Sequence, residues 1–131
     1  YCHLYIDILA PEGPIMANLE KPTDDIVRPG IEWMIAGMPQ MQPTELAEVV
    51  TQPLELELTG PGGGTWTIQP AGEDGLISVA PRANLGASAT VASTAHNFVS
   101  WGTKRSDWRT TCVIDGDENY AASVLDTINI I

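Results

Sequence analysis

The sequence predicts an α+β fold, a largely antiparallel sheet with helices on one face. Two alternating runs, LELELT and TWTIQ, lie on either side of a glycine-rich connection, GPGGG, which is typical of two antiparallel strands joined by a loop. Helical patterns come before the strands and after them, rather than between every pair of strands. Helices grouped in this way cover one face of an antiparallel sheet, whereas regular strand–helix alternation would indicate a parallel one.

The N-terminal part is expected to hold helices. Residues 1–10 carry apolar side chains near helical spacing until Pro11 interrupts the pattern, which predicts a helix. Because this helix has no N-cap of its own, we expect the chain to be the end part of a longer protein. Residues 11–52 are rich in proline and are expected to form a linker with short helices. The clearest of these helices has an apolar face at spacings of three and four residues, formed by Ile31, Met34, Ile35 and Met38.

Residues 53–131 are expected to form the α+β domain itself. The leucines of LELELT alternate with polar residues, which indicates a strand with one buried face. Five strands are expected, at 54–59, 65–69, 76–80, 89–94 and 110–115. Two helices are expected, at 95–102 and 118–128. Thr94 is suited to cap the first of them, and the acidic Asp117 and Glu118 favour the N-terminus of the second.

The composition excludes two classes of partner. The 131 residues carry a formal net charge of −11, with a sequence pI near 4.2. A surface this acidic repels nucleic acid and anionic membranes. The apolar runs fall short of the about 20 residues that span a bilayer, and no export signal is visible. We therefore expect a cytoplasmic protein, with Cys2 and Cys112 as free thiols in a reducing compartment.

Three features that resemble functional motifs are given structural interpretations. GPGGG lacks the lysine and the strand-to-helix context of a phosphate-binding loop, so a hairpin loop is expected. DGDEN, at residues 115–119, lacks the calcium-loop pattern, so a turn followed by a helix N-terminus is expected. His96 stands alone in its region and is expected to pack or cap rather than to catalyse.

Half of the six basic residues lie in one short segment. Lys104, Arg105 and Arg109 fall within six residues, beside Trp101 and Trp108. These cations either balance the acidic residues of DGDEN or form a site for a carboxylate, which a guanidinium beside an aromatic ring recognises well. The residues alone leave both interpretations open.

A second pair of interest lies near the N-terminus. His3 and Asp7 are four residues apart and would share one face of a helix. They are either a surface or interface ion pair, or His3 is a metal ligand whose partners precede Tyr1.

The end of the chain resembles a known family. HNFVSWGTKRSDW and VIDGDENYAASVLDTINII resemble the C-terminal domain of the mycothiol-dependent maleylpyruvate isomerase family and its actinobacterial relatives, and LELELTGPGGGTWTI extends the resemblance over residues 53–131. The resemblance implies a DinB-like helical bundle that holds a divalent metal, followed by a sterol-carrier-protein-like α+β domain. In that division residues 1–10 are the tail of the last bundle helix, and residues 11–52 are the linker.

The resemblance also implies site residues and cofactors. HLYID fits the end of the metal-binding helix, with His3 as a ligand of a divalent metal, zinc, and mycothiol as the thiol cofactor. Arg105, or Lys104 in its place, would be the catalytic cation that contacts a small anionic substrate. The Glu of the motif would precede Tyr1. This chain alone is therefore expected to bind no cofactor and to be inactive without a helical bundle, supplied by the missing N-terminal part or by a partner chain.

Two functions are therefore carried forward. The first is the C-terminal part of a thiol- and divalent-metal-dependent isomerase or transferase, in which Lys104 or Arg105 faces the substrate carboxylate and Arg109 pairs with a neighbouring acid. The alternative is a non-catalytic, sterol-carrier-like binding module for a small apolar or amphipathic ligand. Neither function requires nucleic acid or a membrane as a partner.

Overall fold

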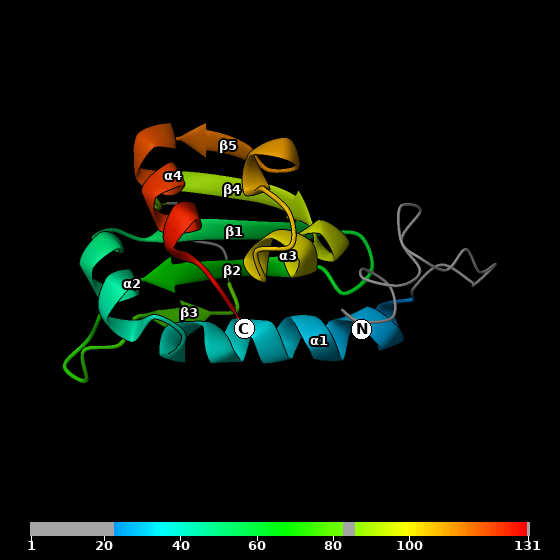
Figure 1. Cartoon of the computed structure of the whole chain (residues 1–131), viewed down its shortest axis with the longest axis horizontal. Coiled ribbons are helices and arrows are strands. Elements are labelled where there is room, and N and C mark those ends of the chain that lie inside the picture. The colour runs from blue at the N-terminus through cyan, green and yellow to red at the C-terminus, as the bar shows by residue number, and fades with distance from the viewer. Residues whose placement is uncertain (1–22, 83–85, 131) are drawn as a thin grey trace.

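The computed structural model describes residues 23–82 and 86–130. The helices are α1 (Asp24–Gly37), α2 (Pro43–Val49), α3 (Ala95–Gly102) and α4 (Glu118–Thr127), with short 3-10 turns η2 (Met38–Gln40) and η3 (Trp108–Thr110). The strands are β1 (Leu54–Thr59), β2 (Gly64–Gln69), β3 (Ser78–Ala80), β4 (Ala89–Thr94) and β5 (Val113–Gly116). The strands form one sheet, and the helices lie together over one of its faces (Figure 1). The predicted α+β class is confirmed.

The sheet has the strand order β3-β2-β1-β4-β5. Three of the four neighbouring pairs are antiparallel, and β1 with β4 is parallel. A parallel pair requires a long crossover connection, here the segment that includes β2 and β3. The sequence predicted a largely antiparallel sheet but gave no indication of this central parallel pair.

The register of β1 follows its alternating sequence. Leu54, Leu56 and Leu58 are at most 3% exposed, whereas Glu57 and Thr59 are exposed. Leu56 pairs with Trp66 of β2 and with Val91 of β4, so these three side chains share the face that the helices cover. The predicted inward orientation of the three leucines is confirmed, because a slip by one residue would have exposed all of them.

The helices before β1 share the core of the sheet. Buried side chains of α1 pack in one cluster with those of the strands and of the later helices. These α1 side chains are Val27, Ile31, Met34 and Ile35. The predicted bundle helix at 1–10 and the first part of the linker lie outside the described residues, so both stay predictions.

Most element bounds agree with the predictions, with one clear error. The strand predicted at 110–115 begins only at Val113, and the chain before it forms the turn η3. The side chain of Asp107 accepts a hydrogen bond from the Arg109 backbone N–H at 3.0 Å and so caps this turn, while Trp108 is buried. The turn η3 therefore occupies residues for which the start of the strand was predicted, and Trp108 packs in the core.

The glycine-rich segment is a loop between β1 and β2, as predicted. Gly60 and Gly62 both have φ of +78°, a conformation that glycine adopts without strain. The Gly62 N–H donates a 2.7 Å hydrogen bond to Oδ1 of Asp24, and Val27 lies too close to Gly62 to admit a side chain there. The loop therefore holds the start of α1 near the end of β1 where the loop begins.

Candidate ligand-binding site

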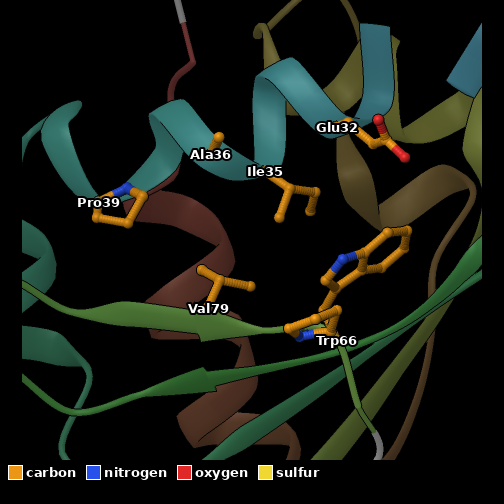
Figure 2. A pocket seen from close by; sticks show the side chains of 7 residues that line it. Glu32, Ile35, Ala36, Pro39, Trp66 and Val79 are labelled. Carbon is orange, nitrogen blue, oxygen red and sulfur yellow. The ribbon is translucent and has the colours of Figure 1, made fainter. Parts of the chain in front are cut away.

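A pocket of about 260 Å³ lies between the second half of α1 and the strands β2 and β3 (Figure 2). Seven described residues line it, six of them apolar and one acidic: Glu32, Ile35, Ala36, Pro39, Trp66, Val79 and Pro81. Apolar walls with a single polar group are typical of sites for small ligands.

Strand pairing fixes the floor of the pocket. Trp66 lies opposite Leu56 of β1 and so points to the covered face of the sheet, where its side chain is 8% exposed. Val79 of β3 pairs with Ile68 of β2, two residues along from Trp66, and reaches the same face. The floor is therefore built from two neighbouring strands, β2 and β3, whose paired residues point to the same face of the sheet.

The roof of the pocket comes from α1 and η2. Ile35 and Ala36 lie three and four residues after Glu32, so all three side chains project from adjacent sides of the helix. Pro39 in η2 closes the far end. Figure 2 shows Glu32 opposite Trp66 at one end of the pocket, and Ile35 opposite Val79 in its middle.

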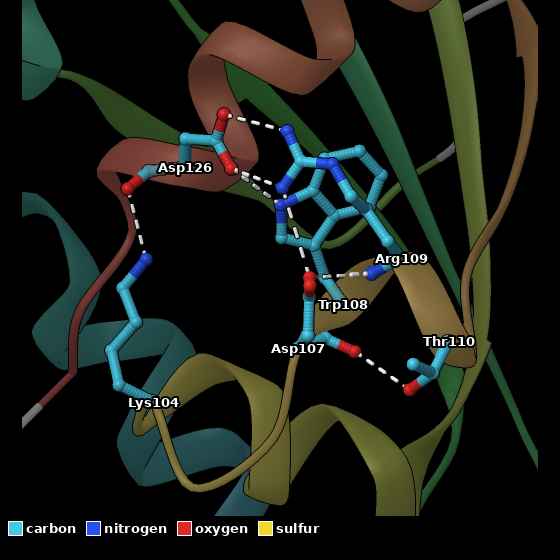
Figure 3. A network of polar contacts seen from close by, with 6 residues as sticks. All are labelled: Lys104, Asp107, Trp108, Arg109, Thr110 and Asp126. Atoms are coloured by element: carbon cyan, nitrogen blue, oxygen red, sulfur yellow. Dashed lines mark hydrogen bonds and ion pairs between the residues drawn. The ribbon is translucent and has the colours of Figure 1, made fainter.

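The predicted site residues do not line this pocket. Lys104 and Arg105 are exposed in the loop that follows α3. Lys104 has φ of +60°, and its Nζ donates a 2.9 Å hydrogen bond to the backbone oxygen of Asp126 at the end of α4 (Figure 3). The Arg105 backbone N–H donates to the Ser100 carbonyl at 2.9 Å, which closes the last turn of α3. Their catalytic roles stay predictions.

Arg109 has the structural role that was expected of it. Its guanidinium donates two hydrogen bonds to the Asp126 carboxylate, at 2.8 and 2.9 Å, and lies 4.3 Å from the centre of the Trp108 ring (Figure 3). The Trp108 Nε1–H donates to the same carboxylate at 2.9 Å. Arg109 thus pairs with Asp126 and not with the acids of DGDEN, which were its partners in one of the two interpretations left open, because the turn η3 directs it to the end of α4. The contacts therefore tie the segment around η3 to the C-terminal helix.

We expect Asp126 to make the stability of the fold sensitive to acid. The hydrogen bonds from Arg109, and then that from Trp108, lower the pKa of Asp126 to about 2. A carboxyl group with a lowered pKa stabilises the folded state above its unfolded pKa, near 4, and this contribution is lost as the pH falls towards 2. Because the side chain is about half exposed, the contribution is about 0.5–1 kcal/mol.

The Asp126→Asn variant tests this expectation by urea unfolding at several pH values. The variant should be less stable than the wild type at pH 6 and equally stable near pH 2. Asp115→Asn, at an exposed position in β5, serves as the matched control and should not reproduce the difference. An equal loss of stability at both pH values would show that the carboxylate charge is not responsible.

The other histidines and cysteines considered in the sequence are only partly covered by the described residues. His3 lies outside the described residues, so its role as a metal ligand stays a prediction. Within residues 23–82 and 86–130, no group of three or more His, Cys, Asp or Glu side chains is arranged to hold a metal ion. His96 lies in the first turn of α3. Burial raises the pKa of the Cys112 thiol to about 11, so this thiol is protonated at neutral pH.

Sequence reasoning did not find the pocket. Its residues come from α1, η2, β2, β3 and the chain just after β3, and no motif connects them. One signal was present, because the alternation in TWTIQ placed Trp66 on an inward face where a large ring needs space. The helical pattern of α1 did not indicate that Ala36, a residue with a small side chain, would lie near Trp66 and leave room for a pocket.

Comparison with known proteins supports the fold. No protein-family model matches the chain, and no curated protein matches it. The chain is similar in structure to the UbiJ-SCP2 ubiquinone synthesis protein, with 16% identity, a TM-score of 0.53, and coverage of 84% of this chain and 94% of that one. It is also similar to the sterol carrier protein domain 2 of Helicoverpa armigera, with 13% identity, a TM-score of 0.54, and coverage of 84% and 91%.

These similarities define the fold class of the chain. At such low identity they show the fold alone, and the chain has a fold like that of sterol carrier protein 2. The predicted sterol-carrier-like fold is therefore confirmed. None of the comparisons shows the maleylpyruvate isomerase or DinB-like family, so that finer assignment stays a prediction. No helix among the described residues is long and apolar enough to cross a membrane.

Proposed function

We propose that this chain is a binding module that holds a small apolar or amphipathic molecule in the pocket beneath α1. The observation that carries the proposal is the pocket itself, with six apolar residues among the seven that line it. A lipid-binding role also accords with the names of structurally similar proteins, one of which is a sterol carrier protein domain.

The pocket suits the apolar part of a ligand better than it suits catalysis. A ligand that transfers its hydrocarbon surface from water into the pocket gains about 25 cal/mol for each Å² buried. Among the described residues, the lining offers neither a nucleophile nor a histidine, and its single titratable side chain is Glu32. A volume of about 260 Å³ lies just below the range of about 300–1,000 Å³ that holds drug-sized ligands, which favours a short chain or a small ring.

Filling the pocket should weaken binding strongly without unfolding the protein. Ala36 is an exposed residue of α1 that lines the pocket, so Ala36→Leu adds three carbon atoms there while a good helix former is retained. We expect the affinity for 1-octanol, followed by the tryptophan indole signals in NMR, to fall by about tenfold or more because the added side chain occupies the ligand's volume.

Glu48→Leu is the matched control. It places the same side chain on an exposed position of α2, outside the residues that line the pocket. This variant should bind 1-octanol like the wild type. If Ala36→Leu also binds 1-octanol with unchanged affinity, the pocket is not the binding site and the proposed function is wrong.

The isomerase function stays a separate proposal for a longer protein that contains the predicted bundle. It is supported by the resemblance of the tail and by the exposure of Lys104 and Arg105 on the loop after α3. In that proposal these two residues would face an anionic substrate, with His3, a divalent metal and mycothiol completing the site.

A further inference from the structure

We propose that the pocket selects amphiphiles whose polar end is a cation, and that Glu32 and Trp66 hold this end together. The inference rests on the proposed function and deepens it, since it names the chemical class of the head group. The apolar part of such a ligand would lie between Ile35 and Val79, with the cation at the end of the pocket where Glu32 faces Trp66 (Figure 2).

The Glu32 carboxylate is the only charged group among the described residues that line the pocket. Its side chain makes no hydrogen bond or ion pair with any other described residue. A carboxylate at the end of an apolar pocket attracts a cationic head group and repels a carboxylate or phosphate. The pocket therefore has a charge preference that its apolar walls alone would not give.

The basic residue nearest to Glu32 on its own helix is held elsewhere. Arg28 lies one helical turn before Glu32, a spacing at which ion pairs are common. Its Nε and one terminal nitrogen instead donate to Asp24, both at 2.9 Å. Asp24 is itself anchored by the 2.7 Å hydrogen bond from Gly62. The loop between β1 and β2 thus fixes Asp24, and Asp24 holds Arg28. Among residues 23–82 and 86–130, Arg28 therefore does not pair with Glu32.

Trp66 adds a second element of cation recognition. The face of an indole ring carries a negative quadrupole and attracts ammonium groups within about 6 Å of its centre. Figure 2 shows the ring of Trp66 at the same end of the pocket as the Glu32 carboxylate. An indole ring and a carboxylate at the same end of a pocket suit a quaternary ammonium, which is too weakly hydrated to prefer water strongly.

Three probes of equal chain length separate the head group from the apolar chain. Octyltrimethylammonium, 1-octanol and octanoate are titrated into the protein below their micelle concentrations, and binding is followed by calorimetry and by the tryptophan indole signals in NMR. We expect octyltrimethylammonium to bind about fivefold more tightly than 1-octanol, and octanoate to bind more weakly than both.

The Glu32→Gln variant should lose most of this preference, and only the part that Trp66 supplies should remain. Its affinity for octyltrimethylammonium should fall towards that of 1-octanol, while its affinity for 1-octanol should not change. Glu57→Gln removes the same charge on the opposite face of the sheet, since Glu57 alternates with the buried Leu56 and Leu58. This control should retain the full preference for the ammonium probe. If Glu57→Gln also lost the preference, the net charge of the protein would explain the result and not the position of Glu32.

The outcomes separate this inference from the function on which it rests. If the wild type binds 1-octanol and octyltrimethylammonium equally, the pocket is a binding site but the head-group inference is wrong. Tighter binding of octanoate that is lost in Arg82→Gln would overturn it as well, because Arg82 follows the lining residue Pro81 and would then set the charge preference. If none of the three probes binds, both proposals fail.

Discussion

Replacing Trp101 by alanine should lower the free energy of unfolding by about 3–5 kcal/mol. Trp101 is 1% exposed and packs edge-to-face against Phe98, with ring centres 5.1 Å apart and planes at 73°. Its Nε1–H also donates a 3.1 Å hydrogen bond to Oγ of Ser93 in β4. The substitution leaves a cavity and removes the link between α3 and the sheet. Because small domains have total stabilities of about 5–15 kcal/mol, the variant should be close to unfolding at 37 °C.

The chain offers a matched control for this substitution. Trp33, also in a helix, is 64% exposed, and Trp33→Ala removes the same side chain without a cavity. Its free energy of unfolding should change by less than about 0.5 kcal/mol. Urea unfolding followed by far-ultraviolet circular dichroism measures both variants without relying on tryptophan fluorescence. Equal losses in the two variants would contradict the placement of Trp101 in the core.

Replacing Gly63 by alanine is expected to have the second largest effect, a loss of about 2–3 kcal/mol. A β-carbon at this position would overlap the backbone carbonyl of Leu58 and lie 2.9 Å from the carbonyl oxygen of Gly60. Both obstacles are backbone atoms, which cannot move aside without disturbing the pairing of β1 with β2. The loop would have to shift, and with it the hydrogen bond from Gly62 that fixes Asp24 and the start of α1.

Gly37→Ala is the corresponding control. No atom lies within 4 Å of a β-carbon at Gly37, and its φ of −79° and ψ of −21° suit any residue. Alanine there should stabilise the protein by about 0.4–1 kcal/mol, because it restricts the unfolded chain. The two variants carry the same chemical change and should shift the urea midpoint in opposite directions. A destabilised Gly37→Ala together with a neutral Gly63→Ala would contradict the geometry of the hairpin loop.

The candidate binding pocket was harder to predict from the sequence than the fold. Lys104, Arg105 and Arg109 attracted attention because cations are scarce in this chain, yet the structure commits Arg109 to Asp126 and directs Lys104 to a backbone carbonyl of the same residue. The pocket lies elsewhere. Glu32, the one charged residue among the described ones that line it, is one of seventeen acidic residues, and nothing in the sequence distinguishes it.

The sequence by itself determined the local structure. Alternation with a period of two placed the β1 leucines inside, and Thr94 caps α3 as predicted, accepting a 3.0 Å hydrogen bond from the Asn97 N–H. Asp117, predicted as a favourable charge at the N-terminus of α4, also accepts a 3.0 Å hydrogen bond from the Tyr120 N–H. Strand alternation and helix caps depend on residues within a few positions of each other. Whether they form can therefore be judged from the local sequence.

Only the tertiary structure decided which distant segments meet. The parallel pairing of β1 with β4, the pairing of Arg109 with Asp126 and the meeting of Glu32 with Trp66 at one pocket join residues that are 17 or more positions apart. Such contacts depend on how the whole chain buries its apolar surface, and many alternative pairings satisfy the same local patterns. For this reason the elements of the fold were predictable from the residues, whereas the pocket that they enclose was not.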